Sequence, residues 1–176
     1  MHRLFALLVL ALAACGEREV KGMPDRPPAP AAAASAAAPA GPAITGEFVA
    51  ISNTATSLTG DLSATPDVLS FARGFRLEGG RVDAALTIAD ALYVGGGTIA
   101  DASGNAGADN IEVRRIENVR VAADAPAPNL CTNGPVRHVV LAQSVQTLSL
   151  LVFSGADAPG RNAQNAQLCA VFNYAP

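Results

Sequence analysis

The chain has 176 residues, of which 50% are hydrophobic and 15% are charged, and its formal net charge is −3 at pH 7. It contains one lysine and no tryptophan, and no basic stretch is dense enough to follow a phosphate backbone, which disfavours nucleic acid as a partner. Beyond the first residues, no apolar run approaches the ~18 residues that predict a membrane-spanning helix.

Residues 1–14 have the layout of an export signal. Arg3 gives a short positive start, residues 4–11 form an apolar run, and small residues then lead to Cys15. Because spanning a bilayer takes about 20 apolar residues, this run is too short to be a mature membrane helix. The sequence therefore predicts an exported protein.

The end of this segment, Leu12-Ala13-Ala14-Cys15, resembles the lipobox of bacterial lipoproteins. The resemblance implies that residues 1–14 are a lipoprotein signal peptide and that Cys15 becomes the mature N-terminus, acylated with fatty chains such as palmitate. In that family an Asp after the cysteine favours the inner membrane, so Gly16 indicates the cell outer membrane, facing the periplasm. The implied partner is the membrane, reached through the N-terminal lipid. An ordinary signal peptide cut at an Ala-x-Ala site is the alternative.

Residues 15–43 follow as a predicted linker. They are rich in alanine and proline, and the prolines remove backbone donors and fix φ, so a continuous helix is not expected. We expect a disordered, semi-rigid spacer. At about 3.1 Å per residue in polyproline-II geometry it reaches roughly 90 Å.

Residues 44–176 have the size of one domain, with eight arginines, no lysine and twelve carboxylates, hence a formal charge of −4. Once Cys15 is assigned to the lipid, Cys131 and Cys169 remain as an even pair. An oxidising envelope favours a disulfide between them. A redox or metal site is the alternative, but 37 residues separate the two cysteines and this region holds one histidine.

Alternating or apolar runs bounded by turn residues predict short strands throughout this domain. Gly79-Gly80 lies between two alternating runs, as in a two-residue hairpin. Residues 87–94 are ambiguous, 124–135 form a Pro-rich loop and 154–167 form a long loop. The predicted strands are 46–52, 56–62, 68–71, 75–78, 81–84, 111–116 with an extension towards 121, 136–142, 148–153 and 168–174. The expected fold is all-β, a small antiparallel barrel or sandwich of about 7–9 short strands.

Several of these segments are also similar to small uncharacterised proteobacterial envelope proteins. The segments are 50–55, 58–61, 135–142, 150–155 and 168–174. That group has no established activity, so the resemblance implies a setting and no function.

One loop has the residue types of a calcium site. Oxygen-bearing side chains recur at alternate positions, as a hard cation requires, and resemble an EF-hand loop at Asp101, Ser103, Asn105, Asp109 and Glu112. The turn position is Ala106, with the glycine one place late at Gly107. The alternative is a solvated loop of turn-forming residues, and we assign no metal.

The other chemistry-bearing residues do not form a catalytic motif in the sequence. His138 is the single histidine of the domain, and we expect it to make a structural hydrogen bond or to face solvent. Arg114 and Arg115 point to opposite faces of a predicted strand, where such charges usually keep a strand soluble. We assign no catalytic residue and no cofactor.

These observations favour a non-catalytic binding or inhibitor-like module in the envelope. Its partner would be an envelope protein or a small apolar ligand. The alternative is a hydrolase or modifying domain for cell-wall or glycan substrates. That alternative requires a deep pocket that gathers Asp61, Asp83 or His138.

Overall fold

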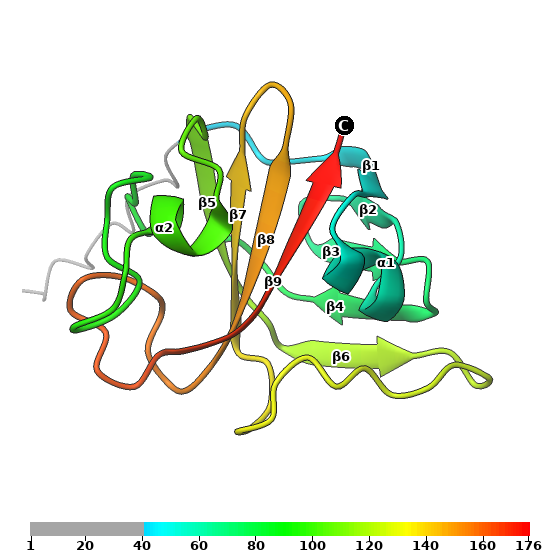
Figure 1. Cartoon of the computed structure of the whole chain (residues 1–176). Coiled ribbons are helices and arrows are strands. Elements are labelled where there is room, and N and C mark those ends of the chain that lie inside the picture. Colours follow the sequence, from blue (N-terminus) through cyan, green and yellow to red (C-terminus); the bar gives the residue numbers. More distant parts are fainter. Residues whose placement is uncertain (1–40) are drawn as a thin grey trace, which may run out of the picture. The chain divides into compact units, whose positions relative to one another are not determined.

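The computed structural model describes residues 41–176, so the predicted signal peptide, Cys15 and the linker up to residue 40 lie outside the described residues. Nine antiparallel strands form one sheet that curls into a half-barrel, accompanied by two short helices (Figure 1). The all-β prediction is confirmed. No helix among residues 41–176 is long and apolar enough to cross a membrane.

The strand order is β5-β7-β8-β9-β1-β2-β3-β4-β6. Every strand pairs antiparallel with its neighbours. The elements are β1 (Gly46–Ala50), α1 (Asn53–Leu58), β2 (Leu62–Ala64), β3 (Val68–Phe71), β4 (Phe75–Glu78), α2 (Ile99–Ser103), β5 (Asn110–Arg115), β6 (Asn118–Val121), β7 (His138–Gln143), β8 (Leu148–Ser154) and β9 (Gln167–Ala175).

Strands β7 and β8 are buried on both faces, which explains their nearly continuous apolar sequence. Alternate residues face two different cores. The inner core lies within the curl, where Val139, Leu141 and Leu150 meet residues of β1–β4 such as Phe48 and Leu69. The outer core lies on the other face and contains Val113, Val140, Leu151, Phe153, Leu92 and Ile99.

The strand predicted for residues 56–62 is wrong, because residues 56–58 form the end of α1 and only Leu62 belongs to a strand. Ser52 acts as the N-cap: its Oγ accepts the backbone N–H of Ala55 at 3.1 Å, and its carbonyl accepts the hydroxyl of Thr56 at 3.0 Å. Such a cap stabilises a helix by about 1 kcal/mol. The alternation of small polar residues therefore yields to a local cap, and the strand resumes only at Leu62.

Gly79-Gly80 does not form the hairpin turn that the sequence predicted. The segment 78–82 instead runs past β5 and β6, accepting N–H groups of Arg115 and Glu117 at 2.9 Å each through the carbonyls of Gly80 and Glu78. The predicted strand 81–84 is reduced to a bridge between Arg81 and Arg114. Since β5 and β6 are the two ends of the strand order, this segment ties those ends together.

The close approach requires glycine at one position. A Cβ on Gly79 would lie 1.9 Å from the carbonyl oxygen of Arg115, whereas a Cβ on Gly80 would meet nothing within 4 Å. We predict that Gly79→Ala lowers the free energy of unfolding by about 2 kcal/mol or more, because backbone must move on both sides of the contact. Gly80→Ala, the matched control, should change it by about 0.5 kcal/mol or less. Equal denaturant midpoints for the two variants would contradict this packing.

Arg114 is the largest correction to the sequence analysis, since its side chain is fully buried. Its Nε donates to Glu112 at 2.5 Å, and its other nitrogens donate to the carbonyls of Thr65 at 2.5 Å and Ile44 at 2.9 Å. The second oxygen of Glu112 accepts the N–H of Ile44 at 2.7 Å. This ion pair thus joins three parts of the chain: the segment before β1 at Ile44, which we call the entry segment; the turn that follows β2 at Thr65; and strand β5.

Removing the charge of Glu112 should leave a buried guanidinium without its counter-ion. We predict that Glu112→Gln lowers the free energy of unfolding by about 3 kcal/mol, the lower end of the effects seen when one partner of a buried pair is removed. Glu117→Gln changes the same atoms at an exposed position and serves as the control. Chemical denaturation of both variants checks this, and equal losses would show that the pair does not hold the fold.

Candidate functional site

A hollow of about 520 Å³ lies where β5 ends, β7 begins and the chain leaves β8. We call it the His138 pocket. It is lined by Arg115, Asn133, Gly134, Pro135, Arg137, His138, Gly155 and Ala156. No acidic side chain belongs to this lining.

Sheet register places the two central side chains on one face. Arg115 of β5 is the direct cross-strand partner of His138 on β7, and His138 in turn is opposite Phe153 of β8. Directly opposed residues point to the same side of a sheet. The backbone of Arg137 is fixed next to them, since its N–H donates to Phe153 at 2.9 Å and its carbonyl accepts from Ile116 at 2.8 Å.

His138 is 6% exposed, and no ring nitrogen has a hydrogen-bond partner within residues 41–176. Its Nδ1 is completely enclosed. The predicted structural hydrogen bond or solvent-facing position is therefore wrong. Leaving a buried polar group unsatisfied costs about 1–3 kcal/mol, so such an exception calls for an explanation.

The surrounding charges act on this imidazole. Burial lowers the pKa of His138, and the positive charges of Arg115 and Arg137 lower it further, while Asp157 opposes them. Asp157 itself accepts the backbone N–H groups of Asn165 and Gln164 at 2.8 and 2.9 Å, which lowers the pKa of its carboxyl. Both arginines line the same pocket as His138.

These two arginines differ from the other six of the described domain. Arg73 donates to a backbone carbonyl, Arg76 and Arg120 pair with Glu78, Arg81 and Arg114 pair with Glu112, and Arg161 pairs with Asp90. Among these eight arginines, only the side chains of Arg115 and Arg137 have neither a hydrogen bond nor an ion pair within residues 41–176. The domain's two unpaired cations thus line one pocket.

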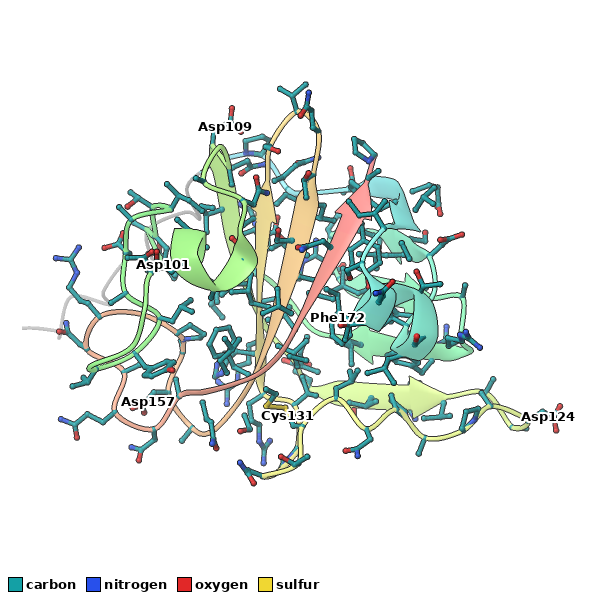
Figure 2. The ribbon with its side chains drawn as sticks, viewed as in Figure 1. Asp101, Asp109, Asp124, Cys131, Asp157 and Phe172 are labelled. Atoms are coloured by element: carbon teal, nitrogen blue, oxygen red, sulfur yellow. A yellow bond between two sulfur atoms is a disulfide. The ribbon has the colours of Figure 1, made fainter. Side chains whose placement is uncertain are left out.

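The Cys131–Cys169 disulfide is confirmed, with Cα atoms 4.9 Å apart across a sequence separation of 38. It ties the Pro-rich loop to β9, near the base of the sheet (Figure 2). A cross-link over a loop of this length stabilises by about 2–4 kcal/mol. Because Asn133, Gly134 and Pro135 follow Cys131 directly, the bond also restrains one wall of the pocket.

The candidate calcium ligands are not brought together. Asp101 caps α2 by accepting from Thr98, and Figure 2 shows it well apart from the exposed Asp109. No three His, Cys, Asp or Glu side chains of residues 41–176 are grouped to hold a metal. The remaining candidates have other partners: Ser103 donates to Ile99, Asn105 to Ala142 and Thr147, and Glu112 pairs with Arg114.

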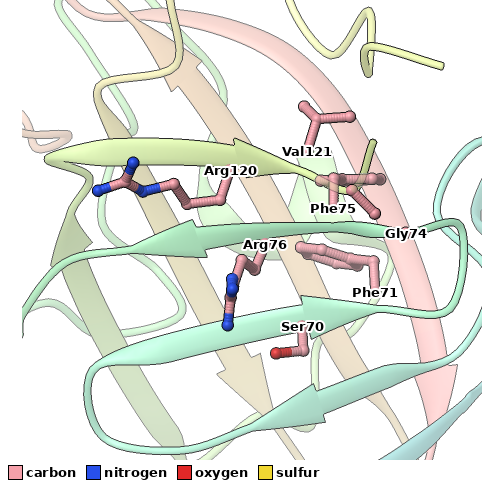
Figure 3. Close-up of a pocket in the computed structure, with 8 residues that line it drawn as sticks. Ser70, Phe71, Gly74, Phe75, Arg76, Arg120 and Val121 are labelled. Atoms are coloured by element: carbon pink, nitrogen blue, oxygen red, sulfur yellow. The ribbon is translucent and has the colours of Figure 1, made fainter. Parts of the chain in front are cut away.

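Two further hollows have their charges internally paired. The first, of about 270 Å³, lies over β3, β4 and β6, where Arg76 and Arg120 share Glu78 beside the stacked Phe71 and Phe75 (Figure 3). The second, of about 400 Å³, contains the ion pair between Arg161 and Asp90. Hydrogen bonds from Thr87 and Arg161 lower the pKa of Asp90 to about 2. Neither hollow leaves a cation without a partner.

The carboxylates weighed for hydrolysis are absent from the His138 pocket. Of the three residues weighed for the hydrolase alternative, His138 lines this pocket. Asp61 instead accepts the N–H of Ala50 at 2.9 Å, and neither it nor Asp83 contributes to the lining, so no carboxylate accompanies the histidine there. No protein-family model, curated protein or solved structure matches the chain. The functional argument therefore depends on the geometry of the chain itself.

Sequence reasoning missed Arg115 and Arg137 as site residues. It named Arg115 only as a charge that keeps a strand soluble, and it did not weigh Arg137, the neighbour of His138. The sequence contains no signal that pairs them, because their proximity comes from the register between β5 and β7.

Proposed function

We propose that this protein is a lipid-anchored lipoprotein of the cell envelope whose β-domain is a non-catalytic binding module. The observation that carries the proposal is the His138 pocket, where two unpaired arginines flank a buried histidine without a hydrogen-bond partner. Elsewhere in the described domain, the arginines are neutralised or hydrogen bonded. Both arginine side chains are exposed, so they remain available to an incoming anion.

The acid that acts electrostatically on His138, Asp157, favours binding over hydrolysis. Glycoside hydrolysis requires one carboxyl group with a raised pKa to protonate the leaving group. Hydrogen bonds from Asn165 and Gln164 instead lower the pKa of Asp157, which keeps its carboxyl ionised. Asp61 and Asp83 do not reach the pocket.

The lipobox resemblance supplies the setting of the proposal. Cys15 would hold the protein at the outer membrane, facing the periplasm, and the Ala/Pro-rich segment would let the domain reach roughly 90 Å from the lipid. A module that must bind a component of the envelope gains from this reach. The partner would be an envelope protein or a small molecule.

The lipid anchor predicts a specific labelling result. In cells given labelled palmitate, the wild-type chain should incorporate the label and sediment with membranes, because stable anchoring needs acyl chains on Cys15. Cys15→Ser should lose both properties. The Cys131→Ser/Cys169→Ser double variant is the control and should retain them. Label on Cys15→Ser would refute the anchor.

The binding role predicts a pocket-dependent capture. Immobilised wild-type protein should retain a component of a detergent-solubilised envelope extract, and the Arg115→Gln/Arg137→Gln variant should lose it. The Arg76→Gln/Arg120→Gln variant removes the same charge from a different arginine-containing hollow and should behave as wild type. Equal capture by all three proteins would contradict the proposal, and release of cleaved glycan fragments would favour the hydrolase alternative.

A further inference from the structure

The side chains that line the His138 pocket include two that carry a positive charge and none that carries a negative charge. Arg115 and Arg137 each carry a guanidinium with five N–H donors in a planar fork, a geometry that matches carboxylate and phosphate oxygens. Asn133 adds an amide, and no side chain in the lining is acidic. A ligand for this lining must therefore supply acceptor oxygens and negative charge.

The buried histidine supplies an independent observation. It is 94% buried, lines the pocket, and has no partner for its imidazole nitrogens within residues 41–176. A ligand oxygen in the pocket would give the ring the hydrogen-bond acceptor that the chain itself does not provide. The enclosed Nδ1 is out of reach of a ligand, so this contact falls to Nε2, which has no hydrogen-bond partner in the described domain and is not among its fully enclosed atoms.

We infer that the His138 pocket binds the oxyanion group, carboxylate or phosphate, of a small molecule, held by Arg115 and Arg137 and by a hydrogen bond from His138. The inference rests on the proposed binding function and names the ligand class of that same site. A volume of about 520 Å³ exceeds the needs of a bare ion and falls in the ~300–1,000 Å³ range of small-molecule pockets.

Proton linkage gives this site a signature that a structural histidine would lack. Without ligand, burial and the charges of Arg115 and Arg137 lower the pKa of His138 below 6.5, against the weaker pull of Asp157. A bound anion offsets the two positive charges and favours the imidazolium, so it raises that pKa. Binding therefore takes up a proton, and affinity rises as the pH falls towards the pKa of the free pocket.

Titration of the purified chain without residues 1–14 tests the inference directly. His138 is then its single histidine, so its ring proton signals are identified by composition. Inorganic phosphate and citrate are the two probes, followed by histidine NMR and by calorimetry at several pH values. We expect a raised pKa of His138 with at least one probe. Once the affinities are corrected for the ionisation of the probe itself between these pH values, binding should be tighter at pH 5.5 than at pH 7.5. The probe that binds more tightly distinguishes phosphate from carboxylate recognition.

Matched variants separate the pocket from general charge effects. Arg115→Gln/Arg137→Gln should weaken binding at least about tenfold, since hydrogen bonds to charged groups contribute ~1.5–3 kcal/mol. Arg76→Gln/Arg120→Gln should bind as wild type, and thermal melts should show that both variants fold. An unchanged pKa of His138 at millimolar levels of both probes, or equal affinity in the two variants, would overturn the inference.

The two proposals fail in different ways. If the arginine variant loses capture of an envelope component while neither probe binds, the binding function holds and the oxyanion assignment is wrong. If both probes bind to the pocket but no envelope component is retained, the oxyanion site holds and the proposed envelope partner is wrong.

Discussion

The guanidinium of Arg114 enters the interior of the half-barrel without any exposed surface, and the structure around it follows from satisfying its donors. Its three acceptors come from β5, from the entry segment at Ile44 and from the turn at Thr65. A buried guanidinium without partners would be prohibitively costly. The entry segment and the turn after β2 are therefore held against β5 by one group.

The ion pair specifies an arrangement more than it adds stability. Replacing such a pair with apolar residues is often neutral or stabilising, because desolvation offsets most of the attraction. The pair has a clearer effect on the register between β5 and β7, because a slip of one residue would turn Arg114 out of the interior and bring Arg115 in. In that position Arg115 would have Val113, not a carboxylate, two residues before it, so the pair penalises the alternative pairing of β5 with β7.

This constraint also produces the His138 pocket. Successive residues of a strand face opposite sides, so burying Arg114 directs Arg115 to the other face, directly across from His138. The sequence predicted that the two arginines diverge, and this was correct. It assigned both to solvent because the acceptors of Arg114 lie 49 and 70 residues away in the sequence, at Thr65 and Ile44.

Local patterns predicted those elements that depend on local physics. β3, β4 and β8 agree with their alternating or apolar runs, and the disulfide followed from the cysteine count. α1 was missed because the cap at Ser52 outweighed a weak alternation. Gly79 was misread because its requirement for glycine comes from a distant carbonyl on Arg115, not from a turn.

The same strand links the entry of the chain to the pocket. The described chain begins beside the start of β5, where Asn110 donates to the carbonyl of Pro42 at 3.2 Å. Arg115 ends that strand five residues later, about 17 Å away at 3.4 Å per residue. The two unpaired arginines therefore lie at the far end of β5 from the point where a linker would join the domain. The domain's net charge of −4 repels anions only weakly at this site, since charges more than about 8–10 Å apart are largely screened at physiological ionic strength.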